Sequence, residues 1–243
     1  MRSPPDGYTI SFGHLGTHVA NGAIYKLGYD LVTDLEPVAL LPSNPMIIVS
    51  KNAVPAKSLK EFIAWLKAQP APPTAGTAGA GSGSHIAGLY FENVAGVKLQ
   101  YVPYRGTGPA MNDLVAGQID LIVDQTSNSI GQVRAGNIRA YAITDSKRVE
   151  SASDIPTVDE AGLKGFETVA WFGLLAPAGT PPEVIAKTRD EVARIIQTPE
   201  LRARIDSLGG EPVGNTPREF AAIIRADIAK WRKLVADANI KAD

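Results

Sequence analysis

The stretch that decides the fold runs Thr74-Ala75-Gly76-Thr77-Ala78-Gly79-Ala80-Gly81-Ser82-Gly83-Ser84-His85. A helical pattern follows it, with its apolar side formed by Ile86, Leu89, Tyr90 and Val94. Glycines let the backbone turn sharply and approach a ligand closely. The free N–H groups at the start of a helix favour an anion. The stretch therefore predicts a turn into a helix, which is either a flexible, well-capped loop or a site for a small anion.

Several phosphate-binding and hydrolase motifs are incomplete in this stretch. Gly76 and Gly81 have Walker A spacing, but Ser82 stands where the phosphate-gripping lysine belongs. Gly79 and Gly81 fit the dinucleotide fingerprint, but Ser84 occupies its third glycine position. No serine has the G-x-S-x-G pattern of a nucleophile elbow. The turn therefore matches no named nucleotide or hydrolase motif.

A second strand–turn–helix pattern runs Val102-Pro103-Tyr104-Arg105-Gly106-Thr107-Gly108-Pro109-Ala110. Pro109 suits a first helical turn, and Thr107 with the Gly106 backbone is available to an anion. Asp124 ends the next expected strand, where α/β folds usually place ligand contacts. Capping of the following turn is the alternative role for this residue.

Composition restricts the class of protein. The chain has 243 residues, of which 44% are apolar and 20% charged, with a net charge of -1. This balance argues against a nucleic-acid-binding protein and against a disordered chain. Cysteine is absent, which excludes disulfides, thiol catalysis and cysteine-bound metals. No apolar run reaches the roughly 18 residues of a transmembrane helix.

Strand and helix signals alternate along the chain. Strand patterns cover residues 8–12, 45–50, 119–123, 138–144 and 171–175. Helix starts stand at Ser58 with Glu61, Thr180-Pro181-Pro182-Glu183, Thr198-Pro199 and Thr216-Pro217-Arg218-Glu219. Leu208-Gly209 marks a helix end. This alternation, followed by a helical C-terminal section, predicts an α/β protein with two lobes.

The histidines do not indicate a metal site. His14 and His18 lie beside Gly13 and Gly16, which predict a loop rather than a helix that would align two metal ligands. For His18 and His85 we expect a neutral imidazole that fixes a loop by hydrogen bonds. No metal and no cofactor are therefore expected.

One enzymatic reading stays open on the residues alone. His85 could act as a base for Ser82 or Ser84, with Asp124 as the group that orients it. Such triads are recognised by geometry and role, and neighbours in sequence seldom have that geometry. A serine hydrolase is thus the alternative to a binding protein without catalysis.

Eight short motifs, taken in order, resemble the tripartite tricarboxylate transporter solute receptors, also called Bug receptors. They are Pro5-Asp6-Gly7-Tyr8-Thr9, Thr17-His18-Val19-Ala20-Asn21, Val54-Pro55-Ala56-Lys57-Ser58-Leu59, Gly79-Ala80-Gly81-Ser82-Gly83-Ser84-His85, Val102-Pro103-Tyr104-Arg105-Gly106 with Pro109-Ala110, Gly117-Gln118-Ile119-Asp120, Asp154-Ile155-Pro156-Thr157-Val158 and Gly173-Leu174-Leu175-Ala176-Pro177-Ala178-Gly179-Thr180-Pro181. Each motif alone is weak. Their common order along nearly the whole chain makes the resemblance specific.

The resemblance implies an α/β fold of the type II periplasmic-binding-protein kind, with two lobes, a hinge and the ligand in the cleft. Residues 1–43 and 178–243 would form the first lobe, incomplete at its N-terminus, and residues 44–177 the second, which carries the glycine-rich turns. Such receptors are periplasmic and perform no chemistry. They capture a small organic acid (a di- or tricarboxylate, an amino acid or an aromatic acid) and pass it to a membrane permease.

The resemblance also implies ligand contacts, through main-chain N–H groups and hydroxyls at helix starts. Carried over by position, these are Thr17, His18, Gly81, Ser82, Ser84, His85, Tyr104, Gly106, Thr107 and Asp124. Asp124 would repel a carboxylate unless the ligand carries a donor or a water lies between them.

The sequence departs from the family pattern in two places. His14 and Leu15 stand where the family often has small hydroxyl residues. Full-length receptors also have a signal peptide and a first strand, turn and helix before the segment that matches Asp6-Gly7-Tyr8-Thr9. We therefore expect this chain to bind its ligand more weakly than a complete receptor.

Overall fold

The computed structural model describes residues 3–237, which divide into two compact units. Unit 1 contains residues up to Ser43, Ala170–Ser207 and the chain from Glu211 onward, and unit 2 contains Asn44–Val169 and Leu208–Gly210. The resemblance implied a lobe of residues 44–177, whereas unit 2 combines Asn44–Val169 with Leu208–Gly210. Residues 170–177, expected in the second lobe, belong to unit 1, because the strand that contains them pairs there.

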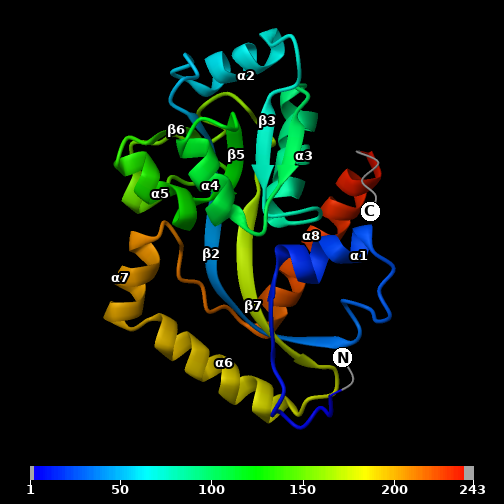
Figure 1. The fold of residues 1–243 in the computed structure, drawn as a ribbon. Coiled ribbons are helices and arrows are strands. Elements are labelled where there is room, and N and C mark those ends of the chain that lie inside the picture. Colours follow the sequence, from blue (N-terminus) through cyan, green and yellow to red (C-terminus); the bar gives the residue numbers. More distant parts are fainter. Residues whose placement is uncertain (1–2, 238–243) are drawn as a thin grey trace. The chain divides into compact units, whose positions relative to one another are not determined.

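Unit 2 is built on a mixed sheet (Figure 1). Its strands are β2 (Leu35–Lys51, of which the second part belongs to unit 2), β3 (Thr74–Thr77), β4 (Gln100–Pro103), β5 (Leu121–Gln125) and β6 (Ile138–Ile143), in the order β6-β2-β5-β3-β4. β3 runs parallel to β4 and β5, and β2 runs antiparallel to β5 and β6. The helices are α2 (Leu59–Ala68), α3 (Gly83–Ala95), α4 (Thr107–Val115) and α5 (Thr126–Arg134), with a 3-10 turn at Glu150–Ala152.

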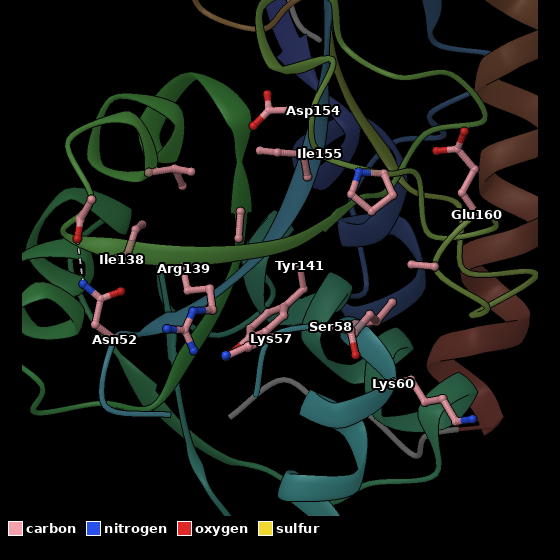
Figure 2. A pocket seen from close by; sticks show the side chains of 16 residues that line it. Asn52, Lys57, Ser58, Lys60, Ile138, Arg139, Tyr141, Asp154, Ile155 and Glu160 are labelled. Atoms are coloured by element: carbon pink, nitrogen blue, oxygen red, sulfur yellow. Dashed lines mark hydrogen bonds between the residues drawn. The ribbon is translucent and has the colours of Figure 1, made fainter. Parts of the chain in front are cut away.

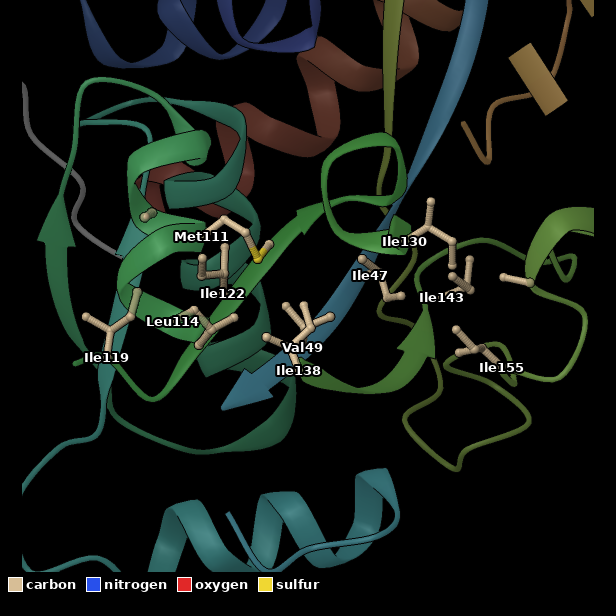
Figure 3. Close-up of a cluster of buried hydrophobic side chains, with 12 residues drawn as sticks. Ile47, Val49, Met111, Leu114, Ile119, Ile122, Ile130, Ile138, Ile143 and Ile155 are labelled. Atoms are coloured by element: carbon tan, nitrogen blue, oxygen red, sulfur yellow. The ribbon is translucent and has the colours of Figure 1, made fainter. Parts of the chain in front are cut away.

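One core of unit 2 lies where α4 and α5 cover the sheet (Figure 3). Alternate residues of a strand point to opposite faces, so Ile122 and Asp124 share the face that this core occupies. Met111 and Leu114 of α4 pack there with Ile122, Ile47 and residues of β6. Burial of these side chains stabilises the helix positions by about 1.5–3 kcal/mol each. The core thereby holds the starts of α4 and α5 against the end of β5.

Unit 1 combines β1, β7 and the first part of β2 with helices. β1 (Ser11–His14) pairs antiparallel with β7 (Val169–Pro177), and a π-helical segment (Gly16–Ala20) leads into α1 (Asn21–Ile24). The chain then ends in α6 (Pro182–Ile196), α7 (Pro199–Ser207) and α8 (Pro217–Asp237). Trp171 packs edge-on against Phe220 of α8 and donates its indole N–H to Asp227 at 2.7 Å. Among residues 3–237, no helix has both the length and the apolar character needed to cross a membrane.

Two expected helix starts are confirmed by their capping bonds. Ser58 accepts the Glu61 N–H at 3.2 Å at the start of α2. Thr216 accepts the Glu219 N–H, and the Glu219 carboxylate accepts the Thr216 N–H at 2.8 Å, as in a capping box. The cap expected at Thr180 is wrong, since its hydroxyl donates to the Pro177 carbonyl and α6 begins one residue after Pro181.

The beginning of unit 1 differs from the expectation in two ways. The first strand covers Ser11–His14 instead of 8–12, because only those residues have a partner in β7. The expected loop around Gly13 and Gly16 is a strand followed by a π-helix. Gly13 is required for close packing rather than for a turn, since a Cβ there would lie 2.2 Å from the His18 ring.

Candidate ligand-binding site

Three helices of unit 2 begin at one edge of its sheet. β3, β4 and β5 run in the same direction, and each is followed directly by a helix: α3, α4 and α5 respectively. Their N-termini therefore gather at the carboxyl ends of the strands, where open α/β sheets bind ligands. The positive ends of three helix dipoles favour a negatively charged ligand at this edge.

The turn between β3 and α3 is held by its own side chains. Gly79 and Gly81 have φ angles of +109° and +70°, which residues with a Cβ rarely adopt. Ser84 Oγ accepts the Ala78 N–H at 2.9 Å, and His85 Nδ1 accepts the Gly81 N–H at 3.0 Å. His85 is thus a neutral imidazole with its proton on Nε2, in the loop-fixing role that the sequence predicts.

Ser82 caps α3, and Ser84 ties the first turn of that helix to the preceding loop. Ser82 Oγ accepts the His85 N–H at 3.3 Å and lies 3.2 Å from Ser84 Oγ. The His85 Nδ1 atom is engaged by the turn backbone, and Asp124 bonds to α5 side chains rather than to His85. Within residues 3–237, the bonds of His85 Nδ1, Ser82 and Ser84 hold the turn and are not the serine–base bond of a hydrolase, so the geometry speaks against the hydrolase alternative.

Some backbone N–H groups of this turn are available for hydrogen bonding. In the part of the chain that the structure describes, the N–H groups of Ala80, Gly83 and Ser84 have no hydrogen-bond partner. Ala80 is exposed and Gly83 half-buried, while the Ser84 side chain is buried. Unpaired N–H groups in the first turn of a helix are a ready site for a carboxylate.

The start of α4 is more open than that of α3. Its N-cap is Gly106, which has a φ of +107° and no side chain to accept a hydrogen bond. The N–H groups of Thr107, Gly108 and Ala110 lack a partner within residues 3–237. Nothing lies within 4 Å of the place where a Cβ of Gly106 would stand. The first turn of α4 can therefore receive an anion without displacing a cap.

Tyr104 is hydrogen-bonded through both its backbone and its side chain. Its N–H donates to the Thr77 carbonyl at 2.9 Å, and its hydroxyl donates to Asp113 Oδ2 at 2.7 Å. Burial and the Asp113 carboxylate raise the pKa of the Tyr104 hydroxyl to about 12. The hydroxyl that was a candidate ligand donor is thus already engaged.

Asp124 lies beneath the starts of α4 and α5. Its side chain is fully buried, and Oδ2 accepts the Asn128 amide at 2.5 Å and the Ser129 hydroxyl at 2.8 Å. Oδ1 has no hydrogen-bond partner among the described residues. Burial raises the pKa of this carboxyl, against the opposing effect of Asn128, Ser129 and the Thr107 hydroxyl. The sequence left two roles open for Asp124, ligand contact and capping of the following turn. The bonds to Asn128 and Ser129 support the second role.

Asn44 belongs to the same edge and was not singled out from the sequence. Its side-chain oxygen accepts the Thr126 hydroxyl at 2.5 Å, and its amide donates to Ser127 Oγ at 2.6 Å. Only 8% of Asn44 is exposed. It therefore fixes the first turn of α5 from β2, a contact across 82 residues of sequence. The neighbouring residues Ser43 and Pro45 form no motif that predicts this contact.

Thr17 and His18 belong to unit 1, whereas the other candidate contacts belong to unit 2. Thr17 Oγ1 is 2.8 Å from His18 Nδ1, and Ser11 Oγ is 3.3 Å from Nε2. Burial, followed by the nearby His14, lowers the pKa of His18. His18 is thus a buried, neutral ring that joins β1 to the π-helical segment.

Among residues 3–237, no group of three or more histidine, aspartate or glutamate side chains is placed to hold a metal ion. The site instead presents N–H groups, hydroxyls and one buried carboxyl, on elements with glycine at the turning points. This is the chemistry of recognition by hydrogen bonds rather than of bond making or breaking.

Solved structures define the class of protein. An R. palustris protein, Rpa4515, solved with adipate, is 33% identical and has a TM-score of 0.89, over 99% of this chain and 81% of that one. MatC from Rhodopseudomonas palustris, solved with malate, is 37% identical with a TM-score of 0.86, over 96% of this chain and 81% of its own. The fold is that of the two-lobed periplasmic binding proteins.

The family follows from the sequence match. The family described as "Tripartite tricarboxylate transporter family receptor" matches residues 1–240, and the chain belongs to it. A protein encoded in the ttuE-ttuC' intergenic region of Agrobacterium vitis is 35% identical over 241 residues, which are 98% of this chain and 70% of that protein. The family and the structural neighbours are solute-binding receptors, not enzymes, as the eight motifs implied.

Proposed function

We propose that this chain is a periplasmic receptor that captures a small organic carboxylate for a membrane permease of the tripartite tricarboxylate type. The observation that carries the proposal is the gathering of three helix starts at one sheet edge, two of them with unpaired N–H groups. The ligands of Rpa4515 and MatC are dicarboxylates, which supports the same ligand class here.

The proposed contacts in unit 2 are the N–H groups and hydroxyls of the two turns. Gly81, Ser82, Ser84 and His85 shape the first, and Gly106 and Thr107 open the second. Tyr104 and Asp124 support these turns from behind through Asp113, Asn128 and Ser129. In unit 1, Thr17 and His18 stay in the proposal as expected contacts, on the resemblance alone.

Neutral donors suit this task. A carboxylate bound by N–H groups at helix starts gains charge-assisted hydrogen bonds without the desolvation of a lysine or arginine. Arg105, exposed beside Gly106, adds a positive charge that attracts an anion from solution. The site can thereby bind and release its ligand without a strong ion pair to break.

A calorimetric ligand screen tests the proposal. Succinate, malate, adipate, citrate, aspartate and benzoate are each titrated into the chain up to about 10 mM, which detects even millimolar affinity. Succinamide and butanediol match the carbon skeleton of succinate without its charge. We expect heat from at least one acid and none from the neutral analogues. Equal behaviour of acids and neutral analogues, or silence from the whole panel, would contradict the proposal.

Ala80→Asp tests the location of the site. Ala80 is exposed in the first turn, so a carboxylate there would repel the ligand and compete for the unpaired N–H groups. We expect the affinity for the acid found in the screen to fall by about tenfold or more, equivalent to about 1.4 kcal/mol. Calorimetry measures this change.

Asn93→Asp is the matched control for Ala80→Asp. It adds the same charge on an exposed position near the other end of α3. We expect its affinity to stay within about twofold of the unchanged chain, because salt screens charges more than about 10 Å apart. An equal loss in both variants would place the ligand elsewhere.

A further inference from the structure

A hollow in unit 2 is lined by residues outside the glycine-rich turns. Its volume is about 500 Å³, within the range of small-molecule sites. The start of α2, the strand β6 and the segment around Ile155 line it (Figure 2). In the sheet, Arg139 at the start of β6 lies opposite Ser50 of β2. Ser50 in turn lies opposite Leu121 at the start of β5. The hollow therefore extends toward the sheet edge opposite the three helix starts.

Arg139 is the central charged group of this hollow. Its Nη1 atom donates to the carbonyls of Val54 at 2.7 Å and Ala56 at 2.6 Å. These two bonds fix the guanidinium plane without neutralising it, because no carboxylate of residues 3–237 lies within ion-pair distance of it. A guanidinium held in this way is pre-organised for an oxygen anion.

Two lysines add unpaired positive charge. Lys57 and Lys60 line the hollow and are exposed, and neither forms an ion pair among the described residues. Figure 2 shows Lys57 and Arg139 beside Tyr141, with Ser58 close by. Ser58 Oγ accepts the Glu61 N–H, and the Glu61 carboxylate accepts the Lys57 N–H. The N–H groups of Leu59 and Lys60 have no hydrogen-bond partner within residues 3–237.

The acidic residues at the rim are already neutralised. Asp154 receives two hydrogen bonds from the Arg134 guanidinium, at 2.6 and 2.9 Å. Glu160 pairs with Arg148 at 2.8 Å and accepts the Thr157 N–H. Neither carboxylate is engaged by a lysine or arginine that lines the hollow. Among the side chains that line the hollow, the charges without an ion pair are therefore positive, while Glu61, which accepts the Lys57 N–H, lies near Tyr141.

We propose that this hollow is a second anion site, which binds a compact small molecule with at least two negative charges on carboxylate or phosphate groups. Arg139 is its anchor, Lys57 and Lys60 supply the remaining charge, and the hollow rests on Ile138 and Ile155, which are buried in the core beneath it. Arginine and lysine recognise carboxylate and phosphate oxygens alike. The proposal does not depend on the function proposed for the glycine-rich turns.

The test is an NMR titration of the isotope-labelled chain with citrate and, separately, inorganic phosphate at constant ionic strength. We expect saturable shifts of the Leu59 and Lys60 amides and of the Arg139 Nε–H group. Saturation by citrate alone assigns carboxylate ligands, and saturation by phosphate alone assigns phosphate ligands. Shifts of Ala80 or Gly83 report the other site separately. Absence of saturable shifts at the first three groups, with both anions, would overturn the proposal.

Arg139→Gln should lower the affinity at this site by about tenfold or more. Lys57→Gln with Lys60→Gln should do the same in a chain that keeps the Arg139 bonds to the backbone, so a folding defect of the first variant leaves the test intact. Lys98→Gln is the matched control, since Lys98 is exposed, forms no ion pair among residues 3–237 and lies outside the hollow. Unchanged affinity in the double variant, or an equal loss in Lys98→Gln, would refute the assignment.

Discussion

Asp124 joins two helix starts through one carboxyl group. Asn128 and Ser129 both donate to Oδ2, and the Thr107 hydroxyl at the start of α4 acts on the same carboxyl. Loss of this carboxyl would leave the buried Ser129 hydroxyl unpaired, at a cost of about 1–3 kcal/mol, and would free the half-buried Asn128 amide. The residue therefore acts on the turns by holding α4 and α5 in place, and its ionisation opposes folding.

The pH dependence of the unfolding free energy reports the protonation of the Asp124 carboxyl. Burial raises its pKa above the ordinary 3.8, so the unfolded chain loses this proton at a lower pH than the folded chain. Stability from this group is fully present below the unfolded pKa and is lost as pH rises toward the folded pKa. We expect Asp124→Asn to show a smaller loss of unfolding free energy over that window than the unchanged chain, measured by urea unfolding.

Asp154→Asn is the control for the pH series. Asp154 is exposed and its pKa is lowered by Arg134, so its contribution has the opposite sign and is lost as pH falls. Its effect should also be small, because surface ion pairs contribute about 0–1 kcal/mol. If Asp124→Asn and the unchanged chain had parallel stability curves, Asp124 would not titrate as its burial requires.

Glycines inside the strands and helices have different structural roles. Gly173 in β7 lies under Phe220, and a Cβ there would stand 2.1 Å from the Phe220 ring. Gly131 in α5 has nothing within 4 Å of its Cβ position. The first glycine permits a strand and a helix to approach closely, whereas the second only adds backbone freedom to a helix.

This contrast predicts opposite effects of the same substitution. Gly173→Ala should lower the unfolding free energy by about 1–3 kcal/mol or more, because the Phe220 ring must move in a packed core. Gly131→Ala should raise it by about 0.5–1 kcal/mol, because alanine is the better helix former. Urea unfolding of both variants measures the difference. A neutral Gly173→Ala would mean that β7 and α8 do not pack as closely as described.

At the scale of the whole molecule, the chain passes between the two units several times. β2 runs from Leu35 to Lys51, and its first part belongs to unit 1 and its second to unit 2. In unit 2, Met46–Ser50 pair with β5, and in unit 1 the Leu40 N–H donates to Asn215. Unfolding of either unit would therefore release a strand that the other one uses.

We expect the two units to unfold together. In a Trp65→Phe variant, the remaining Trp171 and Trp231 both lie in unit 1 and report it by fluorescence. Far-ultraviolet circular dichroism reports the helices of both units. Coincident urea transitions by the two probes are expected for a cooperative two-state change. Separate transitions would show that the shared strand does not couple the units.

The elements with strong local signals could be predicted from the sequence. Apolar runs predicted the strands at Ile47 and Ile122, and capping residues predicted the helices after Ser58 and Thr216, because these signals act between neighbours along the chain. β3 carried no such signal, since Thr74–Thr77 are small residues that form a strand only between β4 and β5. Gly76 is needed there because a Cβ would stand 2.5 Å from Ile119.

The sequence by itself determined the class of protein: an α/β receptor with glycine-rich turns at helix starts and no catalytic motif. Turn chemistry depends on a few adjacent residues, which makes it readable without a fold. Only the tertiary structure decided what each polar side chain does. Ser82 caps α3, Ser84 Oγ accepts the Ala78 N–H, Tyr104 donates to Asp113, and Asn44 bonds to Thr126. The bond between Asn44 and Thr126 depends on packing between segments far apart in the sequence, so no local pattern predicts it, whereas Ser82 and Tyr104 bond within their own strand–turn–helix segments.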